Sequence, residues 1–159
     1  MIKNLVEEVW RTLGPGYTER IYHNALEVML RKHAIPYETE RIIPIVFDNH
    51  VIGNLRADLI VAGSLIVELK SVRTLTDAYR TQIQTYMHLL GISDGLLVNF
   101  GAERSLQMEQ VSGRRGQFQI VPSSITLDLD SPPPSPQEPS QDGTQHQPRR
   151  THWRTPTTS

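Results

Sequence analysis

The chain has 159 residues, 38% of them hydrophobic, which suffices for one folded domain with a hydrophobic core. Its formal net charge of −1 excludes a globally basic protein, so any nucleic-acid-binding surface must be local. The absence of cysteine excludes disulfides and thiol catalysis, and no apolar run approaches the roughly 18 residues of a membrane span.

Two helices are predicted at the start of the chain. Apolar residues recur at helical spacing over residues 2–13, and Gly14-Pro15-Gly16 breaks this first helix. A second amphipathic helix is predicted from about Tyr17 to His33, and Pro36 closes that segment.

Strands and a further helix follow. Strands are predicted at Ile42–Phe47, Val51–Val61 and Leu65–Val72, with a turn at Asp48-Asn49-His50. A third helix is predicted at about Thr76–Leu90, then a short buried strand at Gly95–Phe100 and weaker strands at Gln117–Val121 and Ile125–Leu129. This order predicts a mixed α/β domain with helices against a largely antiparallel sheet.

The composition changes near Asp130. We expect residues 1–129 to form the folded domain. Residues 130–159 hold seven of the eleven prolines and almost nothing apolar, which predicts a disordered tail. Its Arg149, Arg150 and Arg154 around Trp153 are candidates for contact with a protein partner or nucleic acid. The alternative is a solvated extension without function.

Two acids are predicted to face each other across a hairpin. A hairpin centred on Gly63 pairs Val61 with Leu65, and the same register puts Asp58 opposite Glu68. Carboxylates opposed in this way are only roughly 5 Å apart and repel each other. The pair therefore indicates a cation between the acids.

Lys70 is expected on the same face as Glu68, because side chains alternate along a strand. Charges on strands often mark only a solvated face of a sheet. Here they end the nearly continuous apolar runs Leu59–Val61 and Leu65–Val67, which are typical of covered strands. An unpaired charge at the edge of a core is costly, so this position favours a functional site.

Two helical pairs are further candidates. Glu19 and Tyr22, three residues apart, share a face of the second helix, although Glu19 alone is explained by the helix dipole. Gln82 and Tyr86, four residues apart, share a face of the third helix. Taken singly, Tyr86 is equally well read as a core aromatic and Gln82 as a surface residue.

Four motifs together resemble a known family. Gly16-Tyr-Thr-Glu-Arg-Ile-Tyr22 matches the GxxExxY signature, and Asp58 followed by Glu68-Leu69-Lys70 looks like the D…ExK core of the PD-(D/E)XK nuclease superfamily. Gln82-Ile-Gln-Thr-Tyr86 is similar to the QxxxY motif of its RecB-type branch, and Gly95–Gly101 resembles the strand that follows in GxxExxY proteins. The resemblance covers roughly residues 1–110. It departs at Tyr79, where these proteins often carry histidine.

The resemblance implies a restriction-endonuclease-like αβββαβ core with an added N-terminal helix. It implies that Asp58, Glu68, the carbonyl of Leu69 and Glu19 bind Mg²⁺ or Mn²⁺ through oxygen. Lys70 would orient or deprotonate the attacking water and stabilise the developing charge. Gln82 and Tyr86 would hold Lys70 and the nucleic-acid backbone in place.

The expected function is a Mg²⁺-dependent nuclease acting on DNA or RNA in the cytoplasm, with no membrane partner. Arg56, Arg73 and Arg80 are expected to contact phosphate; the alternative is an ion pair for Arg56 and solvating charges for the others. A homodimer is expected if the first helix exposes apolar surface. The alternatives in function are a non-cleaving nucleic-acid-binding or accessory module, and an enzyme for another phosphorylated substrate.

Overall fold

Three helices and six strands make up the part of the chain that this computed structural model describes, residues 1–114 and 116–126. In chain order they are α1 (Ile2–Leu13), α2 (Glu19–Lys32), β1 (Tyr37–Phe47), β2 (His50–Val61), β3 (Leu65–Lys70), α3 (Asp77–Leu90), β4 (Asp94–Asn99), β5 (Ser105–Ser112) and β6 (Gln119–Thr126). The predicted tail, residues 130–159, lies outside the described residues. Among the described helices, none combines the length and apolar character that crossing a membrane requires.

The six strands form one sheet in the order β1-β2-β3-β4-β5-β6. Neighbouring strands are antiparallel except β3 and β4, which are parallel. Parallel neighbours need a crossover connection, and α3 supplies it between β3 and β4. The hairpin of β2 and β3 pairs Val61 with Leu65, as predicted. The prediction of a mixed α/β domain with a largely antiparallel sheet is confirmed.

The end of the sheet differs from the prediction. β5 was not expected, because its Gln and Glu residues have low β propensity; pairing with β4 and β6 overrides that local preference. The two weak strands predicted at residues 117–121 and 125–129 are one strand, β6, up to Thr126, where the described residues end. Pro122 weakened its signal, and the edge position of β6 tolerates a proline.

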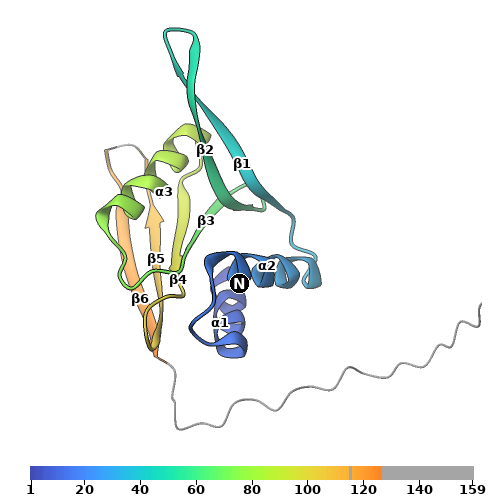
Figure 1. The fold of residues 1–159 in the computed structure, drawn as a ribbon. Helices are drawn as coiled ribbons and strands as arrows, with labels where there is room; N and C mark the ends of the chain where they lie inside the picture. The colour runs from blue at the N-terminus through green and yellow to red at the C-terminus, as the bar shows by residue number, and fades with distance from the viewer. Residues whose placement is uncertain (115, 127–159) are drawn as a thin grey trace, which may run out of the picture.

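The sheet separates two hydrophobic clusters, with α1 and α2 on one side and α3 on the other (Figure 1). In the first cluster the Tyr22 ring stacks on the Phe100 ring, with 4.2 Å between their centroids, and Trp10 packs beside them. In the second cluster Ile83 and Tyr86 of α3 are buried against the sheet. Strands β2 and β3 are therefore covered on both faces where they carry the predicted acids.

A kink interrupts β1 and β2 at Glu40 and Asp58. Leu59 packs with α1 and α2, whereas Ala57 packs with α3, although regular alternation would put both on one face. Glu40 has a left-handed φ of 52°, and the β1–β2 ladder lacks the pair Glu40–Asp58. Disruptions of this kind are over-represented next to active sites.

Beyond this kink, β1 and β2 continue as a two-stranded ribbon that projects from the rest of the molecule (Figure 1). We call residues 42–55 of this ribbon the β1–β2 arm. Asp48 and Asn49 form its turn and both have the left-handed φ that a tight hairpin requires. His50, predicted as part of the turn, is already paired with Phe47.

Candidate active site

Asp58 and Glu68 meet where β2 and β3 separate. The ladder between the two strands ends at the pair Leu59–Val67. At the next pair of positions, hydrogen bonds from backbone to side chain take the place of the backbone pairing between the strands. The Asp58 N–H donates to Glu68 Oε1 at 3.1 Å, and the Leu69 N–H donates to Asp58 Oδ2 at 2.9 Å. The structure therefore brings the two predicted acids together, and each carboxylate holds the backbone of the opposite strand.

Lys70 completes this cluster. Its Nζ donates to Glu68 Oε2 at 3.3 Å, which makes a nearly buried ion pair, since Glu68 is only 1% exposed. The Lys70 Nζ also lies 5.4 Å from the centre of the Tyr79 ring, within the range of a cation–π contact. Tyr79, the position that departs from the resembled family, therefore contacts the catalytic lysine candidate.

Burial determines the electrostatics of the cluster. It raises the pKa of Glu68 to about 8, and the charge of Asp58 raises it as well, while Lys70 lowers it. Burial lowers the pKa of Lys70, but the carboxylates of Glu68, Asp58 and Glu19 together bring it above its usual value. Two carboxylates that share a buried site cannot both ionise easily. An additional cation between them would remove this conflict.

Glu19 approaches the cluster from the first turn of α2. Tyr22, one turn later, holds the preceding loop: its hydroxyl donates to the Gly14 carbonyl at 2.7 Å and accepts the Tyr17 N–H at 3.3 Å. Burial raises the pKa of Glu19; Lys70 and His23 lower it, and Asp58 raises it. The hydrogen bonds of the buried Tyr22 thus fix the loop that leads into the first turn of α2, which carries Glu19.

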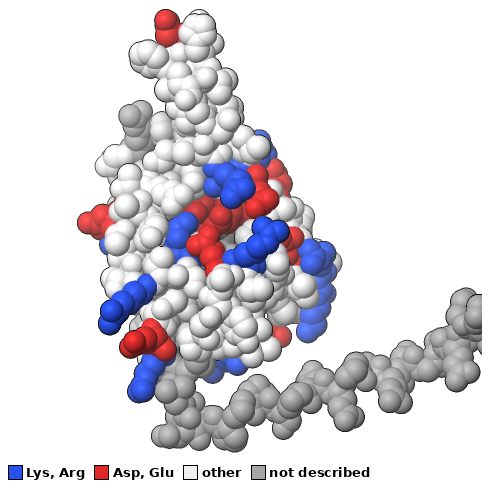
Figure 2. Space-filling view, viewed as in Figure 1, with Lys and Arg blue, Asp and Glu red and all other residues white. Residues whose placement is uncertain are grey.

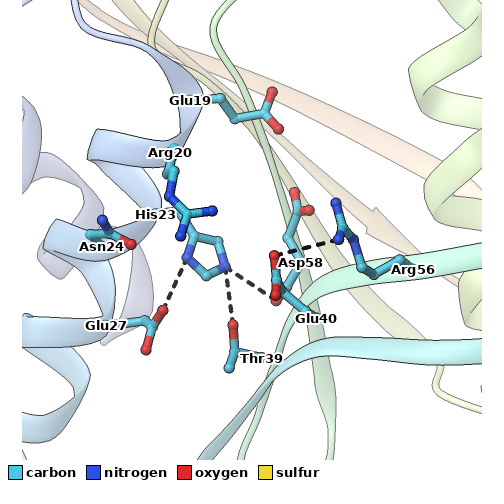
Figure 3. A pocket seen from close by; sticks show the side chains of 9 residues that line it. All are labelled: Glu19, Arg20, His23, Asn24, Glu27, Thr39, Glu40, Arg56 and Asp58. Atoms are coloured by element: carbon cyan, nitrogen blue, oxygen red, sulfur yellow. Dashed lines mark hydrogen bonds and ion pairs between the residues drawn. The ribbon is translucent and has the colours of Figure 1, made fainter.

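A pocket of about 220 Å³ lies between α2 and the β1–β2 hairpin. Figure 3 shows Glu19 from α2 and Asp58 from β2 projecting into the space between these elements. Its lining is Glu19, Arg20, His23, Asn24, Glu27, Thr39, Glu40, Arg56 and Asp58. On the face of Figure 2, acidic side chains gather in a hollow with basic side chains around it.

His23 is a residue that sequence analysis missed. Its Nδ1 lies 3.1 Å from Glu27 Oε1, and its Nε2 lies 3.3 Å from the Asp58 carbonyl oxygen and from the Thr39 hydroxyl (Figure 3). His23 therefore ties α2 to the kinked strands at the predicted metal ligand. The available signal was its spacing of four from Glu19, which places both on one helix face.

Gln82 and Tyr86 lie together on α3. The Gln82 amide donates to the Tyr86 hydroxyl at 2.7 Å, and Tyr86 is buried. Burial raises the pKa of Tyr86, the Gln82 bond lowers it, and Glu68 raises it. The pair therefore borders the cluster, while the hydrogen bond described for Lys70 goes to Glu68.

The three predicted phosphate contacts differ in their surroundings. Arg80 donates to both carboxylate oxygens of Glu109, at 2.7 and 2.6 Å, and to Asp77 at 2.8 Å. Arg56 lies 3.6 Å from Glu40, which is the ion pair given above as the alternative, and both side chains are exposed. Arg73 is exposed in the segment between β3 and α3. The bonds to Glu109 therefore tie Arg80 to the packing of α3 against β5, whereas Arg56 and Arg73 are exposed.

The donor set fits a hard divalent cation in part. Within residues 1–114 and 116–126, no group of three or more His, Cys, Asp and Glu side chains is arranged to hold a metal ion. Glu19 is thus not preassembled with Asp58 and Glu68. The two carboxylates do offer oxygen ligands. The Leu69 carbonyl lies on the same side of β3 as its N–H, which faces Asp58.

Comparison with known proteins shows the family of this chain. The sequence family described as "PD-(D/E)XK nuclease superfamily" matches residues 1–111. The chain belongs to this superfamily. The matched residues of this PD-(D/E)XK protein run from α1 into β5 and contain the whole Asp58–Glu68–Lys70 cluster, and its mixed sheet agrees with a restriction-endonuclease-like fold.

One solved structure is described as "Crystal structure of SSO0001". It is similar to this PD-(D/E)XK chain at 23% identity with a TM-score of 0.42. The match covers 69% of this chain and 50% of the other, so the chain spans about half the length of that structure. No curated protein matches the chain.

Proposed function

We propose that this chain is a divalent-metal-dependent nuclease that hydrolyses phosphodiester bonds of DNA or RNA. One observation carries the proposal. Asp58 and Glu68 are held against each other beside Lys70 at the edge of the core, with the pKa of Glu68 raised to about 8 by burial and by Asp58. A fold that buried these two repelling carboxylates without a functional purpose would be less stable than one with an apolar pair in their place.

The metal ligands in this proposal are Asp58, Glu68, the Leu69 carbonyl and Glu19, and the cation is Mg²⁺ or Mn²⁺. When bound, such a cation polarises a phosphate and lowers the pKa of a water ligand. Glu19 lines the same pocket as Asp58, so it is the third carboxylate available to the site. The Asp58 backbone is held by His23 and Glu68, which limits its freedom to move away.

Lys70 stabilises negative charge in this proposal. Its pKa lies above the usual value, so its ammonium stays protonated near neutral pH and cannot accept a proton. Held by Glu68 and by the Tyr79 ring, it is placed to orient water and to bind the phosphate oxygens that gain charge. Gln82 and Tyr86 support this lysine from α3 and offer an amide to the nucleic-acid backbone.

Phosphates beside the scissile bond are proposed to contact Arg56 and Arg73. Both are exposed, whereas Arg80 is held by Glu109. Arg56 and Asp58 line the same pocket, so a phosphate bound to Arg56 there would lie close to the Asp58 carboxylate. We further propose the GxxExxY family within the RecB-type branch, on the motifs of α2 and α3, and a cytoplasmic location.

A second function is favoured by a specific observation. The described residues contain no preassembled group of three metal-binding side chains. A nuclease-fold module that binds nucleic acid without cleaving it needs no such group. In that case Lys70 and the exposed arginines bind phosphate, and the buried acids orient the lysine.

The test is cleavage by the purified chain with Mg²⁺ or Mn²⁺, on single- and double-stranded DNA and RNA. Controls are EDTA, Glu68→Ala and the matched exposed acid Glu103→Gln. Cleavage that is lost with EDTA and Glu68→Ala and kept in Glu103→Gln supports the nuclease. If the chain binds nucleic acid but cleaves it with neither metal, and Glu68→Ala leaves the binding affinity unchanged, the binding module is supported instead.

A further inference from the structure

The β1–β2 arm carries an exposed apolar surface. Five large apolar side chains of the arm are between 59% and 72% exposed: Ile42, Val46, Phe47, Val51 and Ile52. The outer part of the arm projects from the body of the molecule (Figure 1), whereas Ile43 and Leu55 at its base pack in the cluster that contains α3. An isolated two-stranded hairpin is marginally stable in water, and clustered apolar exposure marks an interaction site. The arm is therefore expected to have a partner.

Nucleic acid does not fit this surface. Between Arg41 and Arg56 the sequence contains no lysine or arginine, and its only charged residue is Asp48 at the tip. A phosphate backbone that ran along the arm would meet no cation, although phosphate contacts supply most non-specific affinity. The apolar side chains instead fit a protein surface of matching character.

A second copy of this chain fits the charges of the arm. Asp48 lies at the tip, and Arg41 and Arg56 lie at the base, where they also contact the exposed acids Glu38 and Glu40 of β1. If two arms pack side by side in opposite directions, each tip acid lies beside the base arginines of the other arm. This arrangement is two-fold symmetric, so one surface satisfies both copies. A tip-to-tip arrangement would bring the two Asp48 carboxylates together.

The edge of the arm agrees with this arrangement. β1 is an edge strand, but Pro44 removes one backbone donor and the ladder is irregular between Ile45 and Val46. Contact through side chains is thus favoured over extension of the sheet.

We propose that the β1–β2 arm forms a homodimer by antiparallel packing against the arm of a second copy. α1, whose exposure of apolar surface would have indicated a dimer, has no large exposed apolar side chain over Ile2–Leu13. The proposal does not depend on nuclease activity. It assigns the self-association of the chain to residues 42–55.

The first test is sedimentation velocity of the full 159-residue chain over a wide range of concentration. Val51→Thr with Ile52→Thr keeps the β-branched shape and removes apolar surface. We expect this double variant to raise the dimer dissociation constant at least tenfold. Val121→Thr, an equally exposed valine on the edge strand β6, is the matched control and leaves it unchanged. A chain that stays monomeric at every concentration overturns the proposal.

Charge exchange tests the orientation. Asp48→Lys alone weakens association, and Arg41→Glu alone weakens it too, whereas a mixture of the two variants associates more tightly than either one. In a tip-to-tip interface Arg41→Glu alone has no effect, and Asp48→Lys mixed with wild type associates more tightly than either protein alone; that result contradicts antiparallel packing.

Cross-linking provides a second readout of orientation, since the chain has no cysteine of its own. Asn54→Cys lies at the pair Pro44–Asn54 in the arm's middle, near the proposed two-fold axis, and is expected to form a disulfide between copies. His50→Cys at the tip is the control and is expected to stay reduced. A disulfide at position 50 without one at position 54 would refute the antiparallel arrangement.

Discussion

Replacing Glu68 with glutamine should stabilise the metal-free protein and at the same time abolish its response to divalent metal. Glu68 is 1% exposed, its pKa is raised to about 8 by burial and by Asp58, and it contacts the Asp58 N–H and Lys70. Glutamine keeps the volume and one acceptor oxygen for the Asp58 N–H, but it never ionises. The substitution therefore isolates the charge from the shape of the side chain.

The magnitude follows from proton linkage. In the unfolded chain Glu68 ionises above the ordinary glutamate pKa of 4.5, whereas in the folded protein it ionises only above about 8. Between these values the folded state binds more protons, so the free energy of unfolding falls as the pH rises through this window. At pH 7 the loss is about 3 kcal/mol. Glutamine avoids it but loses the Lys70 hydrogen bond, which costs about 1 kcal/mol. The expected net gain is about 2 kcal/mol.

Urea unfolding in EDTA from pH 5 to 8 measures this difference. The advantage of Glu68→Gln should be absent near pH 5 and grow steadily towards pH 8. With Mn²⁺ the order reverses, because the cation stabilises the ionised wild-type pair and finds one carboxylate fewer in the variant. Parallel pH profiles for wild type and variant would refute the electrostatic reasoning. Glu103→Gln, an exposed acid, is the control and follows the wild type.

Three further changes test other contacts. His23→Ala removes the contact to the Asp58 carbonyl and should weaken Mn²⁺ binding in calorimetry about tenfold, while Asn24→Ala in the same pocket leaves it unchanged. Tyr22→Phe keeps the ring stack but loses the bond to Gly14, so urea unfolding should show a loss of about 1–2 kcal/mol; no loss would mean that water replaces the bond. Glu109→Gln breaks the enclosed pair with Arg80 and should cost about 2–3 kcal/mol, whereas Asp77→Asn, whose side chain is 96% exposed, should change stability by under about 0.5 kcal/mol.

Local patterns predicted the elements around the acid cluster. Gly63 between two apolar runs determined the register of β2 and β3, and that register is observed. The apolar stripe of α3 placed Gln82 and Tyr86 on one face, where they contact each other. In each case the information lies within about ten residues of sequence.

The remainder depends on contacts between distant segments. β5 has a weak local signal and is held by β4 and β6, which no short window contains. Arg80 has the sequence context of a phosphate contact, but Glu109, 29 residues later, binds it. His23 reaches Asp58 across 35 residues, so its role depends on how α2 packs against the kinked strands. In the sequence alone, Arg80 and His23 are isolated side chains whose partners lie in distant segments.

The kink at Asp58 makes the arm a mechanical extension of the acid cluster. β2 continues from the tip of the arm to the kink at Asp58, whose carboxylate accepts a hydrogen bond from the Leu69 N–H. A lateral force on the tip therefore bends the arm about Glu40 and Asp58. His23 and Glu68 resist that bending through the Asp58 backbone. A partner that binds the arm therefore also acts on the contacts that hold Asp58 and Glu68 together.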